Sequence, residues 1–425
     1  MKFKMLFLCS ALSVLLCFAQ IMNSAPIIMG CLALFLLLTF AACIQNYALP
    51  VLLFFLPWTE LLKLSPKSFS FYTIALLLVE GVWVLKNRFR FKTYYIGITL
   101  LLLLSTLLAK IIAGYTLEKS YLVFLIMIAS YPMIEFAERT YTFEHLCMYF
   151  STGIIIAALT AQKFAAYPNI QQYIRVDSYL NITRRCGYYG DPNFYVAQIT
   201  AALAGCMVLL SRKKKLSPAL MLLVGFLTYC GFLSGSKSFM LLLVALMFLW
   251  IMDIMVSRGV TVKKVALLLV LMIFIVCVVQ SPIFQSKIQV ILTRFSWADN
   301  ASSFTTGRTE IWKKYITDIC NTPRLLFLGQ GFTDIINGPK ASHNTIIQMV
   351  YQFGLFGSVL LIVWMVGLCR EIIDGKHLQD GVLGCLAILL MGALLPWMAI
   401  DILFFDELFL ISTYTLLGVD ELCTR

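Results

Sequence analysis

Residues 343–357 read HNTIIQMVYQFGLFG. A histidine–asparagine pair opens this stretch, nine residues follow, and a G-x-x-G at Gly354 and Gly357 closes it. If the stretch is one helix at about 100° per residue, His343 shares a face with Ile347, Val350 and both glycines. Glycines on a packing face let a neighbouring backbone approach closely. We therefore expect His343 to point into protein and not into lipid.

The chain as a whole is very apolar. Of its 425 residues, 61% are hydrophobic and 13% are charged, and the mean hydropathy is +0.89. Apolar runs of membrane-spanning length recur throughout. The sequence therefore predicts an all-α polytopic integral membrane protein with about 12–14 transmembrane helices and a large extracytoplasmic loop.

The apolar runs divide the chain into five parts. These are the N-terminal transmembrane helices (1–165), a first extracytoplasmic loop (166–191), central transmembrane helices (192–281), a large extracytoplasmic loop (282–342) and C-terminal transmembrane helices (343–425). The run at 48–62 contains Pro50 and Pro57, which favours a broken and partly re-entrant helix. Other spans are expected near 5–22, 26–43, 69–85, 94–113, 120–137, 146–165, 192–210, 217–233, 238–256, 265–281, 343–368, 382–398 and 402–418.

Basic residues indicate how the chain is oriented. They concentrate in short connections that all lie on one side if the N-terminus is cytoplasmic, for example Lys86, Arg88, Arg90, Lys92 and Arg139. Cytoplasmic loops carry such an excess, so we expect cytoplasmic N- and C-termini and both long loops outside. This pattern accounts for the net charge of +12. No aromatic–basic platform for nucleic acid occurs, so no nucleic-acid partner is expected.

The 13 cysteines lie mostly within apolar runs, where a thiol behaves as a small hydrophobic group. Only Cys186 and Cys320 fall in the two long loops, and whether they pair is left open. No C-x-x-C or H-E-x-x-H spacing is present. Acidic residues within or beside apolar runs are expected near helix ends or in structural pairs: Glu60, Glu80, Glu135, Asp253 and Asp401.

The first long loop ends in the sequence RRCGYYGDPN, residues 184–193. Asp191 and Pro192 have the chemistry of a helix start, with an N-cap followed by proline at the first helical position. Capping does not explain the two arginines, Arg184 and Arg185, that precede them. The next outer connection is short, SGSKS at 234–238, and contains Lys237.

The second long loop contains the sequence TGRTEIW at 306–312, which predicts a helix beginning near Arg308. Its apolar residues fall on one side, which is typical of a helix lying along a membrane surface: Ile311, Trp312, Tyr315, Ile316 and Ile319. A turn-rich LGQGF at 328–332 then leads back to His343. This lone G-x-G does not indicate a nucleotide-binding fold.

These motifs resemble those of the O-antigen ligase and O-antigen polymerase superfamily of bacterial envelope glycosyltransferases. The histidine–asparagine pair spaced from G-x-x-G is the most specific match, at His343 and Asn344. The R-x-x-G followed by P-N matches at Arg184 and Asn193, and G-R before Ile-Trp matches at Arg308. The family's usual Ser-Arg reads Ser236-Lys237 here, which keeps the charge but loses the arginine fork.

The resemblance implies transfer of a polyprenyl-diphosphate-linked glycan at the outer face of a bacterial cytoplasmic membrane. It implies catalytic roles for His343, Arg308 and Arg184. Further substrate contacts are expected from Arg185, Lys237, Asn193 and Asn344. Such a reaction needs no cofactor and no metal, and direct displacement inverts the anomeric centre. The expected partners are the lipid-linked oligosaccharide donor, a glycan or lipid-linked acceptor, and membrane lipid.

Several alternatives remain open at this point. The enzyme could extend a lipid-linked chain by repeat units, or it could act as a ligase that delivers a finished glycan to lipid A core, cell wall or protein. We favour repeat-unit polymerisation, because nothing in the loops marks a dedicated acceptor. A lipid-linked oligosaccharide flippase would instead predict paired half-sequences, and no internal repeat is evident. His343 could also serve only to cap its helix.

Overall fold

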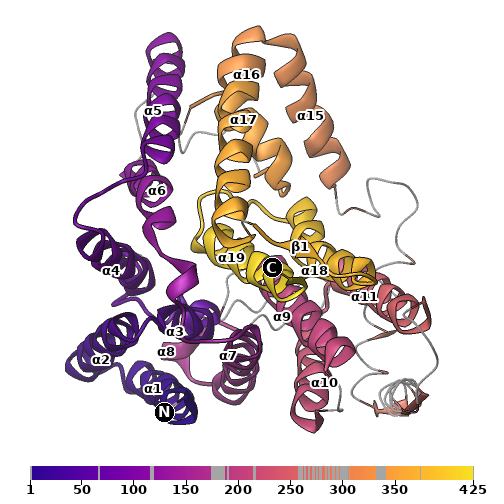
Figure 1. Ribbon diagram of the computed structural model, residues 1–425. Helices are drawn as coiled ribbons and strands as arrows, with labels where there is room; N and C mark the ends of the chain where they lie inside the picture. The colour runs from indigo at the N-terminus through magenta and orange to yellow at the C-terminus, as the bar shows by residue number, and fades with distance from the viewer. Residues whose placement is uncertain are drawn as a thin grey trace.

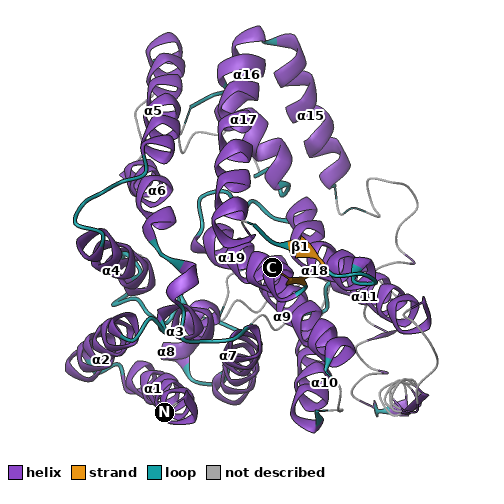
Figure 2. Cartoon of the chain, viewed as in Figure 1, coloured by secondary structure: helices purple, strands orange, loops and turns teal. Residues whose placement is uncertain are grey.

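The computed structural model describes residues 2–65, 68–114, 119–173, 187–188, 191–213, 217–256, 307–331, 341–373 and 375–424, with scattered positions between 262 and 305. Nearly all of the secondary structure in these ranges is helical (Figure 2). The exception is one short antiparallel pair, β1 (His377–Leu378) with β2 (Cys423–Thr424), in which His377 pairs with Thr424. The all-α prediction is confirmed.

Seven of the described helices are long and apolar enough to cross a membrane. A helix of about 20 residues spans about 30 Å, the thickness of the hydrocarbon core. The chain is therefore an all-α membrane protein. These helices are α1 (Lys2–Met22), α2 (Ala25–Ile44), α5 (Thr93–Ala113), α7 (Phe143–Phe164), α9 (Pro192–Arg212), α11 (Lys237–Val256) and α17 (Thr345–Ile373).

The remaining elements are shorter. The expected break in the span at 48–62 occurs at Pro57 and not at Pro50: the buried helix α3 (Ala48–Phe55) runs through Pro50 and passes into the 3-10 turn η1 (Leu56–Trp58), which contains Pro57. The expected span at 265–281 lies largely outside the described residues. The other short elements are α4 (Phe71–Lys86), α6 (Lys119–Ser130), η2 (Tyr131–Met133), η3 (Phe136–Glu138), α8 (Pro168–Gln171), α10 (Pro218–Leu233), α15 (Arg308–Asn321), α16 (Pro323–Leu328), α18 (Leu383–Leu394), η5 (Leu395–Ala399) and α19 (Asp406–Glu421).

The helices form three groups around α19 (Figure 1). One group holds α1, α2, α3, α4 and α7, a second holds α9, α10, α11 and α18, and a third holds α5, α6, α15, α16 and α17. Helix α19 contacts α7, α9, α17 and α18. Helix α19 is buried along most of its length. The segment that leads into it, residues 400–405, therefore lies close to all three groups of helices.

The expectation of one continuous helix from His343 to Gly357 is wrong. Helix α17 begins at Thr345, and its backbone leaves the helical conformation at Gly354, where φ is 64° and ψ is −175°. His343 therefore does not share a helical face with the two glycines. The physical reason for the break is a second segment of backbone that docks against it.

That segment is the turn after α16, Gly329–Gly331. The N–H groups of Gln330 and Gly331 donate to the carbonyls of Tyr351 (2.8 Å) and Gln352 (2.9 Å), next to the break. A Cβ at Gly354 would lie 2.4 Å from the carbonyl oxygen of Phe327. The expected close approach of a backbone at Gly354 is thus confirmed, but the partner is the end of α16. We call this contact between the turn Gly329–Gly331 and the break at Gly354 the docked turn. Nine residues separate Asn344 from Gly354, so this spacing sets the distance from the docked turn to the histidine.

Candidate functional site

His343 lies in a short segment, Ser342–Thr345, that is bound by the carboxylate of Asp401. One carboxylate oxygen accepts the hydroxyl of Ser342 and the N–H of Asn344 (3.1 Å), and the other accepts the N–H of His343 (2.8 Å). Thr345 adds a further link, because its hydroxyl donates to the carbonyl of Ile400 at 2.7 Å. The turn Ile400–Ile402 therefore fixes the backbone on both sides of the histidine.

Asn344 ends the segment by capping α17. Its side-chain oxygen accepts the N–H groups of Ile346 (3.0 Å) and Ile347 (3.1 Å), which would otherwise lack partners in the first turn. Asn344 is buried, with 3% of its surface exposed. The structure thus gives the expected substrate-binding residue a local structural role.

The backbone of His343 is left-handed, with φ of 50°. This conformation costs a non-glycine residue about 1–3 kcal/mol, and the surrounding hydrogen bonds must offset that cost. Ser342, Asn344 and Thr345 are almost fully buried, whereas the imidazole is 34% exposed. Its Nδ1 lies 3.8 Å from the Asp401 carboxylate. The fold therefore holds one basic side chain at a surface, beside an acid, on an otherwise buried segment.

Helix α15 is attached to this segment through Trp312. The indole N–H of Trp312 donates to the carbonyl of Ser342 at 2.9 Å. Arg308, the first residue of α15, lies one helical turn before Trp312 on the same face. The structure thus brings the helix that carries Arg308 against the segment that carries His343.

The buried side of α15 packs on α17. The rings of Tyr315 and Tyr351 meet edge to face, with centroids 4.8 Å apart. Burial, the neighbouring Tyr351 and the charge of Asp401 raise the pKa of Tyr315 above its ordinary value. The expected helix is confirmed, although Ile316, which we placed on its apolar side, is 49% exposed.

Asn193 and Lys237 are brought together at the starts of α9 and α11. The side-chain oxygen of Asn193 accepts the hydroxyls of Ser236 and Ser238, each at 3.4 Å, and Lys237 lies between these serines. The expected cap at Asp191 is confirmed, since its carboxylate accepts the N–H of Asn193 at 2.7 Å. Two of the expected substrate-binding residues thus belong to one small cluster.

The segment Ile400–Glu407 contacts both the His343 segment and the start of α9, where Asn193 lies. Near its start, Asp401 binds the His343 segment, and near its end the ring of Phe405 packs edge to face on that of Phe194, with centroids 4.9 Å apart. Phe194 directly follows Asn193. Glu407 also accepts the side-chain amide of Gln198 at 3.2 Å, inside the protein. One short segment therefore links motifs that lie about 150 residues apart in the sequence.

Arg184, Arg185 and Cys186 lie outside the described residues. The nearby Tyr188 is buried, with its hydroxyl 3.0 Å from the thiol of Cys17 and its ring packed on Trp58. The end of the first long loop is thereby anchored against α1 and η1.

Most of the acids that we expected at helix ends or in structural pairs have such partners. Glu60 forms an ion pair with Lys63 at 2.7 Å, Glu80 accepts the hydroxyl of Ser130, and Asp253 accepts the thiol of Cys385. Asp401 differs, because it binds the backbone of the candidate site. Sequence reasoning missed this role. A signal was available, since Asp401 falls in the turn between the runs 382–398 and 402–418, on the side predicted for His343.

No protein-family model matches this chain, and no curated protein matches it either. Its function is therefore inferred from the residues of the site.

Proposed function

We propose that this protein is a glycosyltransferase that moves a polyprenyl-diphosphate-linked glycan onto an acceptor hydroxyl at the outer face of a bacterial cytoplasmic membrane. Repeat-unit polymerisation of an envelope polysaccharide is the reaction we favour. In the proposed topology about 12–14 helices span the membrane, both termini are cytoplasmic, and the His343 end of α17 faces outward.

One observation carries the proposal: a partly exposed imidazole on a backbone fixed by Asp401, next to the helix that carries Arg308. An imidazole can take a proton from a hydroxyl near neutral pH, and Asp401 fixes the backbone that carries this one. A guanidinium suits the opposite task, because its fork binds diphosphate oxygens in pairs. The site therefore offers a base for the acceptor and a cation for the leaving group.

The proposed reaction is a direct displacement. The acceptor oxygen attacks the anomeric carbon of the donor sugar, the bond from that carbon to the diphosphate oxygen breaks, and His343 takes the acceptor proton. The released polyprenyl diphosphate keeps the electron pair of the broken bond. Arg308, with Arg184 and Lys237, stabilises the negative charge that grows on the diphosphate. These cations serve the role that a metal ion has in other transferases, so the proposed transfer is metal-independent and inverting.

The test compares His343→Ala, His343→Gln and the control His145→Ala. His145 lies in the first turn of α7, where its Nδ1 accepts the N–H of Thr142 at 3.1 Å. A general base at His343 predicts a loss of about 10²–10⁴-fold in transfer for both His343 variants, with donor binding retained. Glutamine cannot take a proton, but it can replace a hydrogen-bond donor. Substantial activity in His343→Gln alone would make the residue a diphosphate ligand.

The same variants expressed in a deletion strain separate the two acceptors. Loss of long glycan chains, with single repeat units still attached, indicates polymerisation. Loss of attachment, with long lipid-linked chains accumulating, indicates a ligase. Wild-type turnover by His343→Ala would exclude His343 from the site and remove the main support for the proposal.

A further inference from the structure

The loop between α4 and α5, residues 87–92, reads NRFRFK and alternates cations with aromatic rings. Its two phenylalanines are exposed to solvent or lipid, Phe89 by 65% and Phe91 by 38%. Lys92 pairs with Glu371 at 2.6 Å. Arg88 and Arg90 are exposed and form no ion pair with any residue that the structure describes. The loop therefore presents two uncompensated positive charges interleaved with apolar rings.

The conformation of this loop is fixed. Arg88 and Phe89 are both left-handed, with φ of 51° and 58°, which is strained for residues other than glycine. The N–H of Phe89 donates to the carbonyl of Val84 at 2.9 Å, and the side-chain amide of Asn87 donates to the carbonyl of Met133 at 2.9 Å. Left-handed residues are common where a helix ends, so these two close the last turn of α4 and hold the loop in one conformation.

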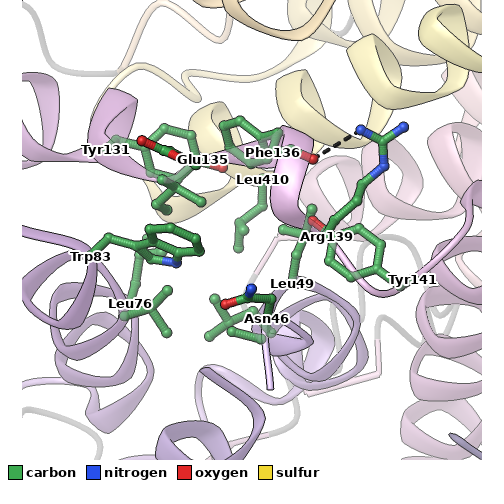
Figure 3. Close-up of a pocket in the computed structure, with 14 residues that line it drawn as sticks. Asn46, Leu49, Leu76, Trp83, Tyr131, Glu135, Phe136, Arg139, Tyr141 and Leu410 are labelled. Atoms are coloured by element: carbon green, nitrogen blue, oxygen red, sulfur yellow. Dashed lines mark hydrogen bonds between the residues drawn. The ribbon is translucent and has the colours of Figure 1, made fainter. Parts of the chain in front are cut away.

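A pocket, shown in Figure 3, lies beside the end of α4 that leads into the loop: its lining includes Trp83 and Ile134, next to the Met133 carbonyl that Asn87 binds. Its floor is apolar, with Leu76, Val79 and Leu410 among the lining residues, and its volume is about 30 Å³, room for about two water-sized groups. Trp83 lines it, and the Lys86 ammonium lies 4.3 Å from the centre of the Trp83 ring. The pocket is therefore small, mainly apolar and bordered by a cation.

Two charged residues in the pocket lining affect what can bind. Arg139 is held by Asp420 at 2.6 Å and by the carbonyl of Phe136, to which it points in Figure 3. Glu135 is exposed, so it repels an anion near the pocket. The remaining positive charge comes from the α4 side, from Lys86, Arg88 and Arg90.

We propose that this loop and pocket bind an anionic phospholipid of the membrane. The phosphate meets Arg88 and Arg90, the two phenylalanines lie among the acyl chains, and the first methylene groups enter the pocket. Juxtamembrane cations attract anionic lipids in this way. A soluble phosphate would gain nothing from the exposed rings or the apolar pocket.

This site is separate from the His343 site and does not depend on its chemistry. Glu371, the partner of Lys92, lies near the C-terminal end of α17, whereas His343 precedes the N-terminal end. The helical stretch from Leu355 to Glu371 alone spans about 24 Å, so the two sites lie at different ends of α17.

The test measures thermal unfolding of the purified full chain in detergent, with phosphatidylglycerol or phosphatidylcholine of identical acyl chains added. Phosphatidylglycerol should raise Tm of the wild type by about 4 °C or more, and phosphatidylcholine by much less. Arg88→Gln/Arg90→Gln should lose most of this shift, and Arg88→Lys/Arg90→Lys should keep most of it. Glu135→Gln should lower the lipid concentration needed.

The matched control is Lys313→Gln/Lys314→Gln, which removes the same charge from the exposed side of α15. It should respond to phosphatidylglycerol as the wild type does. Glycerol phosphate serves as the soluble probe and should give no shift.

Three outcomes would overturn the proposal: an equal shift with phosphatidylcholine, an undiminished shift in Arg88→Gln/Arg90→Gln, or an equal shift with glycerol phosphate. If the double glutamine variant is too unstable for unfolding measurements, native mass spectrometry of freshly extracted protein gives the answer. Fewer retained phosphatidylglycerol molecules than in the Lys313→Gln/Lys314→Gln control support the site, and equal numbers refute it.

Discussion

Two aspartates at opposite ends of α19 bind their surroundings in different ways. Asp401 precedes the helix and accepts hydrogen bonds from a hydroxyl and two backbone N–H groups, all neutral. Asp420 lies in the last turn and pairs with two cations, Arg139 and Lys376. Its side chain is 3% exposed, whereas that of Asp401 is 13% exposed. The charge of Asp420 is compensated, and that of Asp401 remains available to the imidazole beside it.

The difference separates an acid that pairs with cations from one that binds the backbone of the proposed site. A buried carboxylate with two cations holds three chain segments together, namely η3, the turn after α17, and the end of α19. A carboxylate bound only by neutral donors has no cation beside it to offset a charge, in contrast to Asp420. Helices α17 and α19 are thus joined at one end through Asp401 and at the other end through Asp420, and substitutions can perturb the two ends separately.

The largest effect on stability is expected from Gly354→Ala. This change disrupts the contact between the turn Gly329–Gly331 and α17, in the half of α17 that is nearer His343. Both the left-handed backbone, with φ of 64°, and the backbone of Phe327 at 2.4 Å oppose a Cβ there. We expect a loss of about 4 kcal/mol in the free energy of unfolding. Thermal unfolding in detergent measures it.

Gly375→Ala is the matched control at the opposite end. Gly375 has nearly the same φ, 68°, but nothing lies within 4 Å of a Cβ placed on it. Only the backbone strain remains, so the expected loss is about 1 kcal/mol. Equal losses in the two variants would show that strain alone, and not the docked turn, makes Gly354 necessary.

The next effect in size is expected from Asp420→Asn. This change leaves Arg139 and Lys376 without their carboxylate, and we expect the protein to lose about 3 kcal/mol of stability. Transfer activity per folded molecule should not change, because Asp420 lies far from His343.

Adding Lys376→Met to Asp420→Asn should recover part of the stability, because one unpaired cation is then removed. A fall in turnover of the folded Asp420→Asn protein would contradict the division between a structural and a functional end.

Asp401→Asn should have the smallest effect on stability, about 1.5 kcal/mol. The asparagine oxygen can still accept hydrogen bonds on one side, but its NH₂ group replaces the other carboxylate oxygen. That NH₂ group then faces a backbone N–H, and two donors cannot form a hydrogen bond with each other. Transfer should nevertheless fall by about 10²-fold, because the segment carrying His343 is displaced. The loss should appear in kcat, with little change in KM for the lipid-linked donor.

Asp401→Glu retains the charge but moves it by one methylene group, so partial activity is expected. Turnover of Asp401→Asn equal to that of the wild type would place Asp401 among the structural acids with Asp420.

Local features of the structure could be predicted from the sequence. Helix α9 begins at Pro192 behind the cap of Asp191, and α15 begins at Arg308, both as expected. Each of these starts depends on residues within one turn of one another. The return of the second long loop to the His343 segment could also be anticipated, since a loop must return to the helix that it enters; the structure shows this return at α15, through Trp312.

Other features of the candidate site could not be predicted. A glycine in an apolar run looks the same whether the helix continues or breaks, and at Gly354 the outcome depends on N–H donors more than twenty residues earlier. The partners of Asp401 are likewise more than fifty residues away. No local pattern marks such a pair.

By itself the sequence determined that this chain is helical and membrane-embedded, and where many of its helices start, because burial in lipid and the capping of helix ends depend on composition and on neighbours along the chain. Only the tertiary structure decided that α17 breaks at Gly354, that His343 stands outside its helix, and that Asp401 holds it. Each of those features requires a hydrogen bond or a close backbone contact between segments that folding alone brings together.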